Sequence, residues 1–215
     1  SYSVTGVQTC ALPISLLMSA ILTAGCSGRS PDDGQAFPEE LVSFEPWPDN
    51  PVFAGTGADT WDRNIRERGW IMRETDGWHM WYTGYNDDFS DTKYLGYATS
   101  ANGYSWTRHE GNPIYTARWV EDMMIVREDG TLYMVAEGRN DIAHLMVSHD
   151  GVSWIDHGDL DVRKTDGTPI DPGPYGTPTL WREHGRWYLF YERNDGGIWL
   201  AASEDMTVRT NRQDD

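Results

Sequence analysis

The stretch "SHDGVSW", Ser148 to Trp154, has a near copy upstream in "SANGYSW", Ser100 to Trp106. A phrase that recurs within one chain indicates an internal repeat, and a period of tens of residues is typical of solenoids and propellers. In each copy, Asn102 or Asp150 and the glycine that follows predict a tight bend, after which the tryptophan begins a new strand. We therefore interpret the phrase as part of the scaffold rather than as part of a binding site.

A longer repeat surrounds this phrase. The dipeptide Arg-Glu recurs at spacings of 54 and 55 residues, beginning at Arg73, Arg127 and Arg182. Each copy follows an apolar run and precedes a glycine turn, an aromatic-rich run, and a further run that ends in serine. These runs are short, rich in β-branched and aromatic residues, and bounded by Gly, Asp and Asn, which is typical of strands and hairpins. Four strands in about fifty residues, repeated, predict the blades of a β-propeller.

The predicted fold is all-β, a propeller of four-stranded antiparallel blades with about three blades between residues 44 and 215. The third repeat ends at "SEDMTVRTNRQDD", early in its fourth strand. Since propellers close with 4–8 blades, we expect this sequence to be truncated at its C-terminus.

The composition limits the partners. The chain has 34 Asp and Glu against 17 Lys and Arg, a net charge of −17, which disfavours binding to the phosphates of nucleic acids. Eleven Trp and eleven Tyr exclude a disordered acidic tail. Aromatic rings and carboxylates are also the side chains of carbohydrate sites, because the apolar face of a sugar stacks on a ring. Composition alone favours the simpler explanation, a tryptophan-rich β core.

The N-terminal region is not expected to belong to the fold. Residues 1–14 resemble a translated sequencing adapter, and residues 15–26, "SLLMSAILTAGC", resemble a secretory signal that ends in a bacterial lipoprotein box. Cys26 would then carry the lipid, and residues 27–43 would form a polar tether. This interpretation predicts a periplasmic or surface lipoprotein of the bacterial cell envelope, with the lipid anchor as its only membrane contact. A buried helix with a chance cysteine is the alternative.

Four phrases carry a resemblance to a known family: "WDRNIRERGWIMRETDGWHMWYTGYN", "YLGYATSANGYSW", "VEDMMIVREDG" and "PYGTPTLW". Together they resemble the five-bladed β-propeller glycoside hydrolases, the broad grouping around families 43, 32 and 130, over about Phe44 to Met206. The resemblance implies hydrolysis of glycosidic bonds in an oligo- or polysaccharide, without a cofactor. It also implies three acidic residues, one from each of the first three blades, that act as base or nucleophile, pKa modulator and general acid.

The repeat alignment gives the candidate acids. Carboxylates just before an innermost strand, or at the end of the strand after it, converge on one mouth of the channel. Asp122 is the best match, and the first blade offers Glu67 or Asp62. The third blade has "YGTP" where the family's acid Glu is expected, so Glu137 or Glu192, at the ends of second strands, are candidates to supply it. Structural ion pairs with Arg139 or Arg193 are the alternative for these two glutamates.

Three aromatic residues precede innermost strands and are candidate sugar platforms, although packing in the core or at the rim explains them equally well: Trp61, Trp119 and Tyr175. Arg139, two residues after Glu137, is a further candidate for substrate binding. The histidines show no metal-ligand spacing, so no metal is expected.

Two other functions also fit the sequence, and a third is disfavoured. A carbohydrate-binding propeller without catalysis fits the departure at "YGTP", and a glycoside phosphorylase fits the same family resemblance. A six-bladed sialidase-like propeller is disfavoured, because the phrase at Ser148 is one residue shorter than the sialidase Asp-box and no arginine triad is evident.

Overall fold

The computed structural model describes residues 43–66, 68–88, 90–170, 175–193, 196–207 and 209–212. Cys26, the expected adapter and signal segments and nearly all of the tether lie outside these residues, so those interpretations stay predictions. From Trp47 onward the chain forms one compact unit. Its only helix among the described residues is a short 3₁₀ turn, Arg139–Asp141. No helix in this part of the chain has the length and apolar character needed to span a bilayer.

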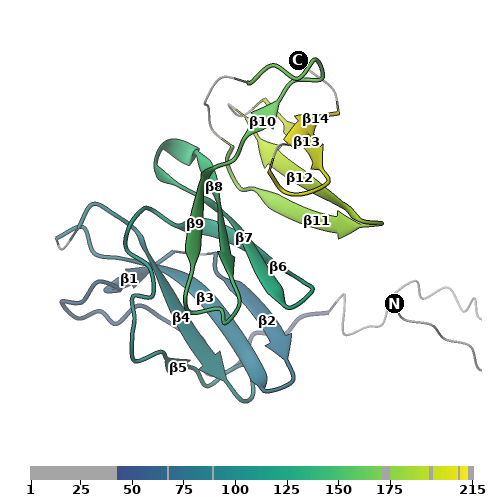
Figure 1. The fold of residues 1–215 in the computed structure, drawn as a ribbon. Helices are drawn as coiled ribbons and strands as arrows, with labels where there is room; N and C mark the ends of the chain where they lie inside the picture. The colour runs from purple at the N-terminus through teal and green to yellow at the C-terminus, as the bar shows by residue number, and fades with distance from the viewer. Residues whose placement is uncertain are drawn as a thin grey trace, which may run out of the picture. The chain divides into compact units, whose positions relative to one another are not determined.

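The strands form three separate sheets, one for each predicted repeat (Figure 1). The first contains β1 (Asn64–Ile65), β2 (Trp70–Glu74), β3 (Gly77–Tyr85), β4 (Tyr94–Ser100) and β5 (Thr107–Arg108). The second contains β6 (Glu121–Glu128), β7 (Thr131–Glu137), β8 (Ala143–Ser148) and β9 (Ile155–Asp159). The third contains β11 (Thr179–Glu183), β12 (Arg186–Glu192), β13 (Ile198–Ser203), β14 (Arg209–Asn211) and also β10 (Val162–Arg163).

Each sheet contains four consecutive antiparallel strands, so the prediction of propeller blades is confirmed. Two short strands were not predicted. β1 adds to β3 on the side opposite β4, and β10 pairs with β14 in parallel. The innermost strand of the second blade, β6, contacts the innermost strands of the other two blades, β2 and β11.

Strand alternation provides each blade with two apolar faces. Trp81 and Leu95 of the first blade lie in one cluster with Ile125 and Met134 of the second. Val135 and Ala143 of the second blade occupy the matching repeat positions and pack against Leu180 and Leu189 of the third. The core of this unit therefore lies between the blades.

The repeated Arg-Glu dipeptide links successive blades. Glu74 of the first blade pairs with Arg127 of the second at 3.0 Å, and Glu128 of the second pairs with Arg182 of the third at 3.2 Å. One residue of the dipeptide therefore faces the preceding blade and the other faces the following blade, which accounts for its recurrence.

The repeated serine phrase has the scaffold role that the sequence predicts. The Ser100 hydroxyl accepts a hydrogen bond from the Gly103 N–H at 2.9 Å, and the Ser148 hydroxyl accepts one from Gly151 at 2.8 Å. Both glycines have positive φ, and the indole N–H of the tryptophan that follows donates to each glycine's carbonyl. Trp154 then packs edge-on against Trp81 of the first blade.

Candidate active site

Several carboxylates meet where β6 begins and β7 ends. Glu121, the first residue of β6, lies directly opposite Glu137, the last residue of β7. The pairing is irregular between Glu121 and Met124, and Asp122 within this bulge has a φ of 45°. Bulges re-aim the side chains beside them, and they are common next to active sites.

Glu137 is the acid with the most altered environment. Its side chain is almost completely buried, and its Oε2 accepts a hydrogen bond from the Thr177 N–H of the third blade at 2.9 Å. Burial raises the pKa of Glu137 to about 7, with the Thr177 N–H opposing the shift and the nearby Asp141 and Asp122 adding to it. At neutral pH this carboxyl therefore populates both its neutral and its ionised form.

Asp141 was missed by the sequence reasoning. It lies in the 3₁₀ turn after β7, outside the repeated runs, so no repeat position marks it. Its influence on Glu137 arises from the turn, which brings two acids four residues apart close together.

Two arginines from the segment leading into β2 reach the other two acids. The Arg66 Nε lies 3.1 Å from the Glu121 Oε2, and the Arg68 Nη1 lies 3.7 Å from the Asp122 Oδ2. Burial raises the pKa of Glu121, and the Trp119 indole and the Arg66 guanidinium oppose that rise. The predicted acid Glu67 lies outside the described residues, although its neighbours Arg66 and Arg68 both point to this site.

One carboxylate oxygen of Asp122 can still accept a hydrogen bond. Its Oδ1 is buried and has no hydrogen-bond partner among the described residues. Since buried polar atoms are nearly always paired, this oxygen is suited to receive a proton donor that enters the site.

Gly176 leaves room between two glutamates. A Cβ at this position would lie 3.2 Å from the Glu192 Oε2 and 3.5 Å from the Glu137 Oε2. The "YGTP" segment, which lacks the expected acid, therefore carries a glycine next to carboxylates from β7 and β12. The structure brings together the predicted acids Asp122, Glu137 and Glu192.

Trp119 lies among cations rather than in the core. The Lys93 Nζ is 4.3 Å from the centre of its ring and the Arg139 guanidinium carbon is 5.1 Å away. Arg139 forms its ion pair with Asp91 at 3.0 Å. Substrate binding by Trp119 and Arg139 stays a prediction.

Three further predicted site residues make structural contacts. Asp62 is buried in the first blade, where it accepts hydrogen bonds from Arg108, Tyr82 and Thr60 at 2.8, 3.2 and 3.0 Å. Trp61 stacks on Tyr82, and Tyr175 is buried edge-on against Tyr191. The ring contacts of Trp61 and Tyr175 match the packing alternative, and Asp62 forms an ion pair with Arg108. The Tyr175 N–H donates to the Asp141 carbonyl at 2.7 Å, so the Tyr175 backbone lies beside the acids.

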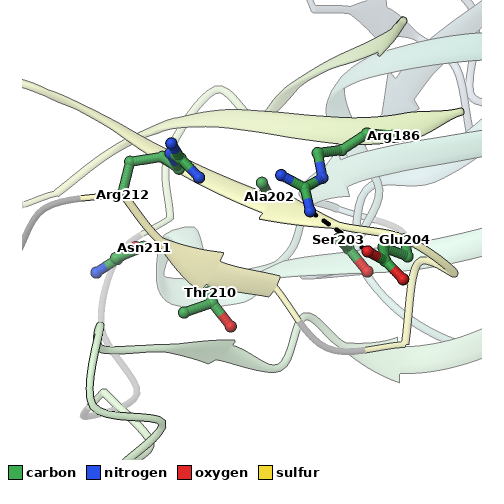
Figure 2. Close-up of a pocket in the computed structure, with 7 residues that line it drawn as sticks. All are labelled: Arg186, Ala202, Ser203, Glu204, Thr210, Asn211 and Arg212. Carbon is green, nitrogen blue, oxygen red and sulfur yellow. Dashed lines mark hydrogen bonds and ion pairs between the residues drawn. The ribbon is translucent and has the colours of Figure 1, made fainter. Parts of the chain in front are cut away.

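A surface hollow in the third blade contains none of these acids. It has a volume of 280 Å³ and is lined by Arg186, Ala202, Ser203, Glu204, Thr210, Asn211 and Arg212 (Figure 2). Within it Arg186 pairs with Glu204 at 3.3 Å. Among the described residues, no group of three or more His, Cys, Asp or Glu side chains is arranged to hold a metal ion.

The fold is that of the β-propeller glycoside hydrolases. A candidate glycoside hydrolase from Parabacteroides distasonis superposes with a TM-score of 0.62 at 16% identity, covering 79% of this chain and 59% of that one. A glycosyl hydrolase from Bacteroides ovatus superposes with a TM-score of 0.61 at 17% identity, covering 79% of this chain and 58% of that one. A third structure comes from the family 130 mannoside phosphorylases, a family that contains hydrolases targeting β-1,2 mannosidic linkages in Candida mannan. It superposes with a TM-score of 0.60 at 17% identity, covering 77% of this chain and 56% of that one.

The chain thus spans less than two thirds of the length of these proteins. Neither a family model nor a curated protein sequence matches it.

Proposed function

We propose that this chain is part of a glycoside hydrolase that cleaves oligo- or polysaccharides with Glu137 as the general acid. The observation that carries the proposal is the environment of Glu137, whose pKa of about 7 keeps the carboxyl partly protonated near neutral pH. A glycosidase needs one carboxylic acid that remains neutral to protonate the leaving oxygen.

Asp122 is the proposed partner of Glu137. Its unpartnered Oδ1 accepts a proton from water, or attacks the sugar, while the Arg68 guanidinium lies 3.7 Å from Oδ2. The second carboxylate of a glycosidase acts in one of these two ways, and the separation of the two carboxyl groups decides which. A Cβ at Gly176 would lie 3.2 Å from the Glu192 Oε2, so Glu192 is a third carboxylate near Glu137.

A phosphorylase is the second candidate. The cations Arg66, Arg68 and Lys93 lie around the acids, and a phosphate that replaces water as the nucleophile needs such positive charge. The likeness to the family 130 mannoside phosphorylases supports this candidate at the level of the fold.

The test is turnover of aryl-glycosides and natural oligosaccharides by the full-length protein, with and without inorganic phosphate. We expect hydrolysis that is lost in Glu137→Gln and Asp122→Asn and retained in the exposed controls Glu110→Gln and Asp49→Asn. An absolute requirement for phosphate would establish the phosphorylase. Saturable sugar binding without turnover would reject both enzymes in favour of a carbohydrate-binding propeller.

A further inference from the structure

The third blade contains a variant copy of the serine phrase. The Ser203 hydroxyl accepts a hydrogen bond from the Met206 N–H at 3.0 Å, and Met206 has the positive φ of the glycines in the other two copies. Six residues after the serine, where the first two copies have Trp106 and Trp154, this copy has Arg209. A cation therefore occupies a position that an apolar ring fills in the other copies.

Arg209 is buried without a partner. Its side chain is 2% exposed, and its Nε and Nη2 atoms are buried and make no hydrogen bond. No ion pair with Arg209 forms within the described part of the chain. Burial lowers the pKa of Arg209 to about 10, against the attraction of Asp161 and Asp205. A buried, unpaired charge is unfavourable, so the folded protein would be stabilised by any anion that reaches it.

The nearby acids are already engaged. Asp161 is held by Arg163 at 2.8 Å. Asp159 is held by Arg118, and Asp205 accepts the Thr207 N–H at 2.9 Å within its own turn. None of these carboxylates hydrogen-bonds to Arg209, and Asp161 and Asp205 act on its charge only through space.

A cavity lies next to the Arg209 side chain. Arg209 lines a cavity of 250 Å³ between the second and third blades. Its walls include the apolar residues Leu145, Val147 and Met206, and side chains that can donate hydrogen bonds, Tyr133, His157 and Thr207. The carboxylates Asp159 and Asp205, which make the contacts described above, also line it. A water molecule takes about 30 Å³ of liquid volume, so the cavity is large enough for a phosphate or a carboxylate group.

We propose that this cavity is a binding site for a small oxyanion, held by Arg209, which stabilises the junction of the second and third blades. Charge-assisted hydrogen bonds from a guanidinium to a carboxylate or a phosphate are among the strongest in proteins. The hollow in Figure 2 is a poorer candidate, because its Arg186 already pairs with Glu204. None of the acids proposed for catalysis lines the cavity, so the site is independent of the proposed function.

The experiment measures the Tm of the protein as phosphate or acetate is added at constant ionic strength. For the unmodified protein we expect a rise of roughly 3–6 °C once the anion exceeds its Kd tenfold. A rise with phosphate alone would assign the site to phosphate-type anions, and a rise with both would extend it to carboxylates. No rise with either anion would overturn the proposal.

Two variants locate the effect. Arg209→Trp restores the residue of the other two copies and should abolish the rise, whereas Arg209→Lys should retain part of it. If Arg209→Trp does not fold, calorimetric titration of phosphate into Arg209→Lys should still show weaker binding than in the unmodified protein. An equal rise in Arg209→Trp, or equal affinity in Arg209→Lys, would contradict the assignment. Glu137→Gln should keep the full rise, which separates this site from phosphate binding among the catalytic acids.

A third variant tests Asp205 as the counter-charge. Asp205→Asn keeps the turn, because Asn102 accepts the same backbone hydrogen bonds in the first copy. Removal of this negative charge should tighten anion binding if Arg209 needs an external anion. A fall in Tm with no gain in anion affinity would show that Asp205 itself neutralises Arg209 and would overturn the proposal.

Discussion

Thr83, Glu137 and Glu192 occupy one repeat position but make different contacts. The Thr83 hydroxyl donates to the Val120 carbonyl of the second blade at 3.0 Å, and Glu137 accepts from the Thr177 N–H of the third. The position therefore reaches the segment that leads into the next blade. The sequence identified the position, but the degree of burial of each side chain depends on segments 37 to 40 residues away.

The ionisation of Glu137 predicts a pH dependence of activity. As general acid it must be protonated, so kcat/KM should fall as the pH rises above about 7, its folded-state pKa. The measurement is the pH profile of kcat/KM for the full-length protein. An activity that stays constant up to pH 9 would remove Glu137 from the role of acid.

The same shift predicts a dependence of stability on pH. The folded pKa of Glu137 lies above its ordinary value of 4.5, so its stabilising contribution is full below pH 4.5 and is lost as the pH rises through about 7. Glu137→Gln should remove this decline from the free energy of unfolding measured between pH 5 and 8. The exposed Glu110→Gln should leave the decline unchanged.

The burial of His144 predicts the opposite trend, a stability that falls as the pH is lowered. It is fully buried without a well-aligned hydrogen bond, and burial lowers its pKa to about 4. Since the folded state resists protonation, the stability present above pH 6.5 is lost as the pH falls toward 4, by up to about 3 kcal/mol. Urea unfolding of His144→Leu should show a weaker loss of stability in acid. An identical loss in His144→Leu and in the exposed control His157→Leu would contradict this.

At the scale of elements, most strands could be predicted. The second and third runs of each repeat became strands, because alternating apolar residues have faces to bury on both sides of a blade. β1 and β10 could not be predicted, since two-residue strands carry no periodic pattern and form only where a neighbouring strand offers free backbone groups.

The hairpins between first and second strands offer a test of turn chemistry. Asp129 and Gly130 in the second blade, and His184 and Gly185 in the third, all have positive φ, which defines a type I′ turn. Histidine is less suited to the first position than Asn or Asp. His184→Asn should therefore stabilise the protein by about 0.5 kcal/mol, measured by urea unfolding. His157→Asn, at an exposed position without positive φ, should produce no gain.

At the scale of the whole chain, the third blade exposes an apolar sheet face whose counterparts in the first two blades are buried. Phe190 and Ile198, in the positions of Val135 and Ala143, are 39% and 72% exposed, and Trp181 beside them is also exposed. Apolar sheet faces of this kind promote association.

This exposure predicts self-association of the 215-residue chain. Analytical ultracentrifugation should show a mass that rises with concentration, and the combined Phe190→Ser and Ile198→Thr substitutions should reduce it. Ile155→Thr replaces an equally exposed isoleucine in β9 and should not. A monomer at all concentrations would contradict the prediction.

The sequence by itself determined the repeat, the strands and the serine turns, because these depend on local alternation and on short hydrogen bonds within a few residues. The tertiary structure decided which acids meet. It placed Asp62 in an ion pair within the first blade, and it brought Glu137 close to Asp122 and, at Gly176, to Glu192. It also buried Arg209 where the other copies have tryptophan. Burial and charge arise from contacts between segments far apart in the chain, such as Glu137 with Thr177 and Asp62 with Arg108, which no local pattern encodes.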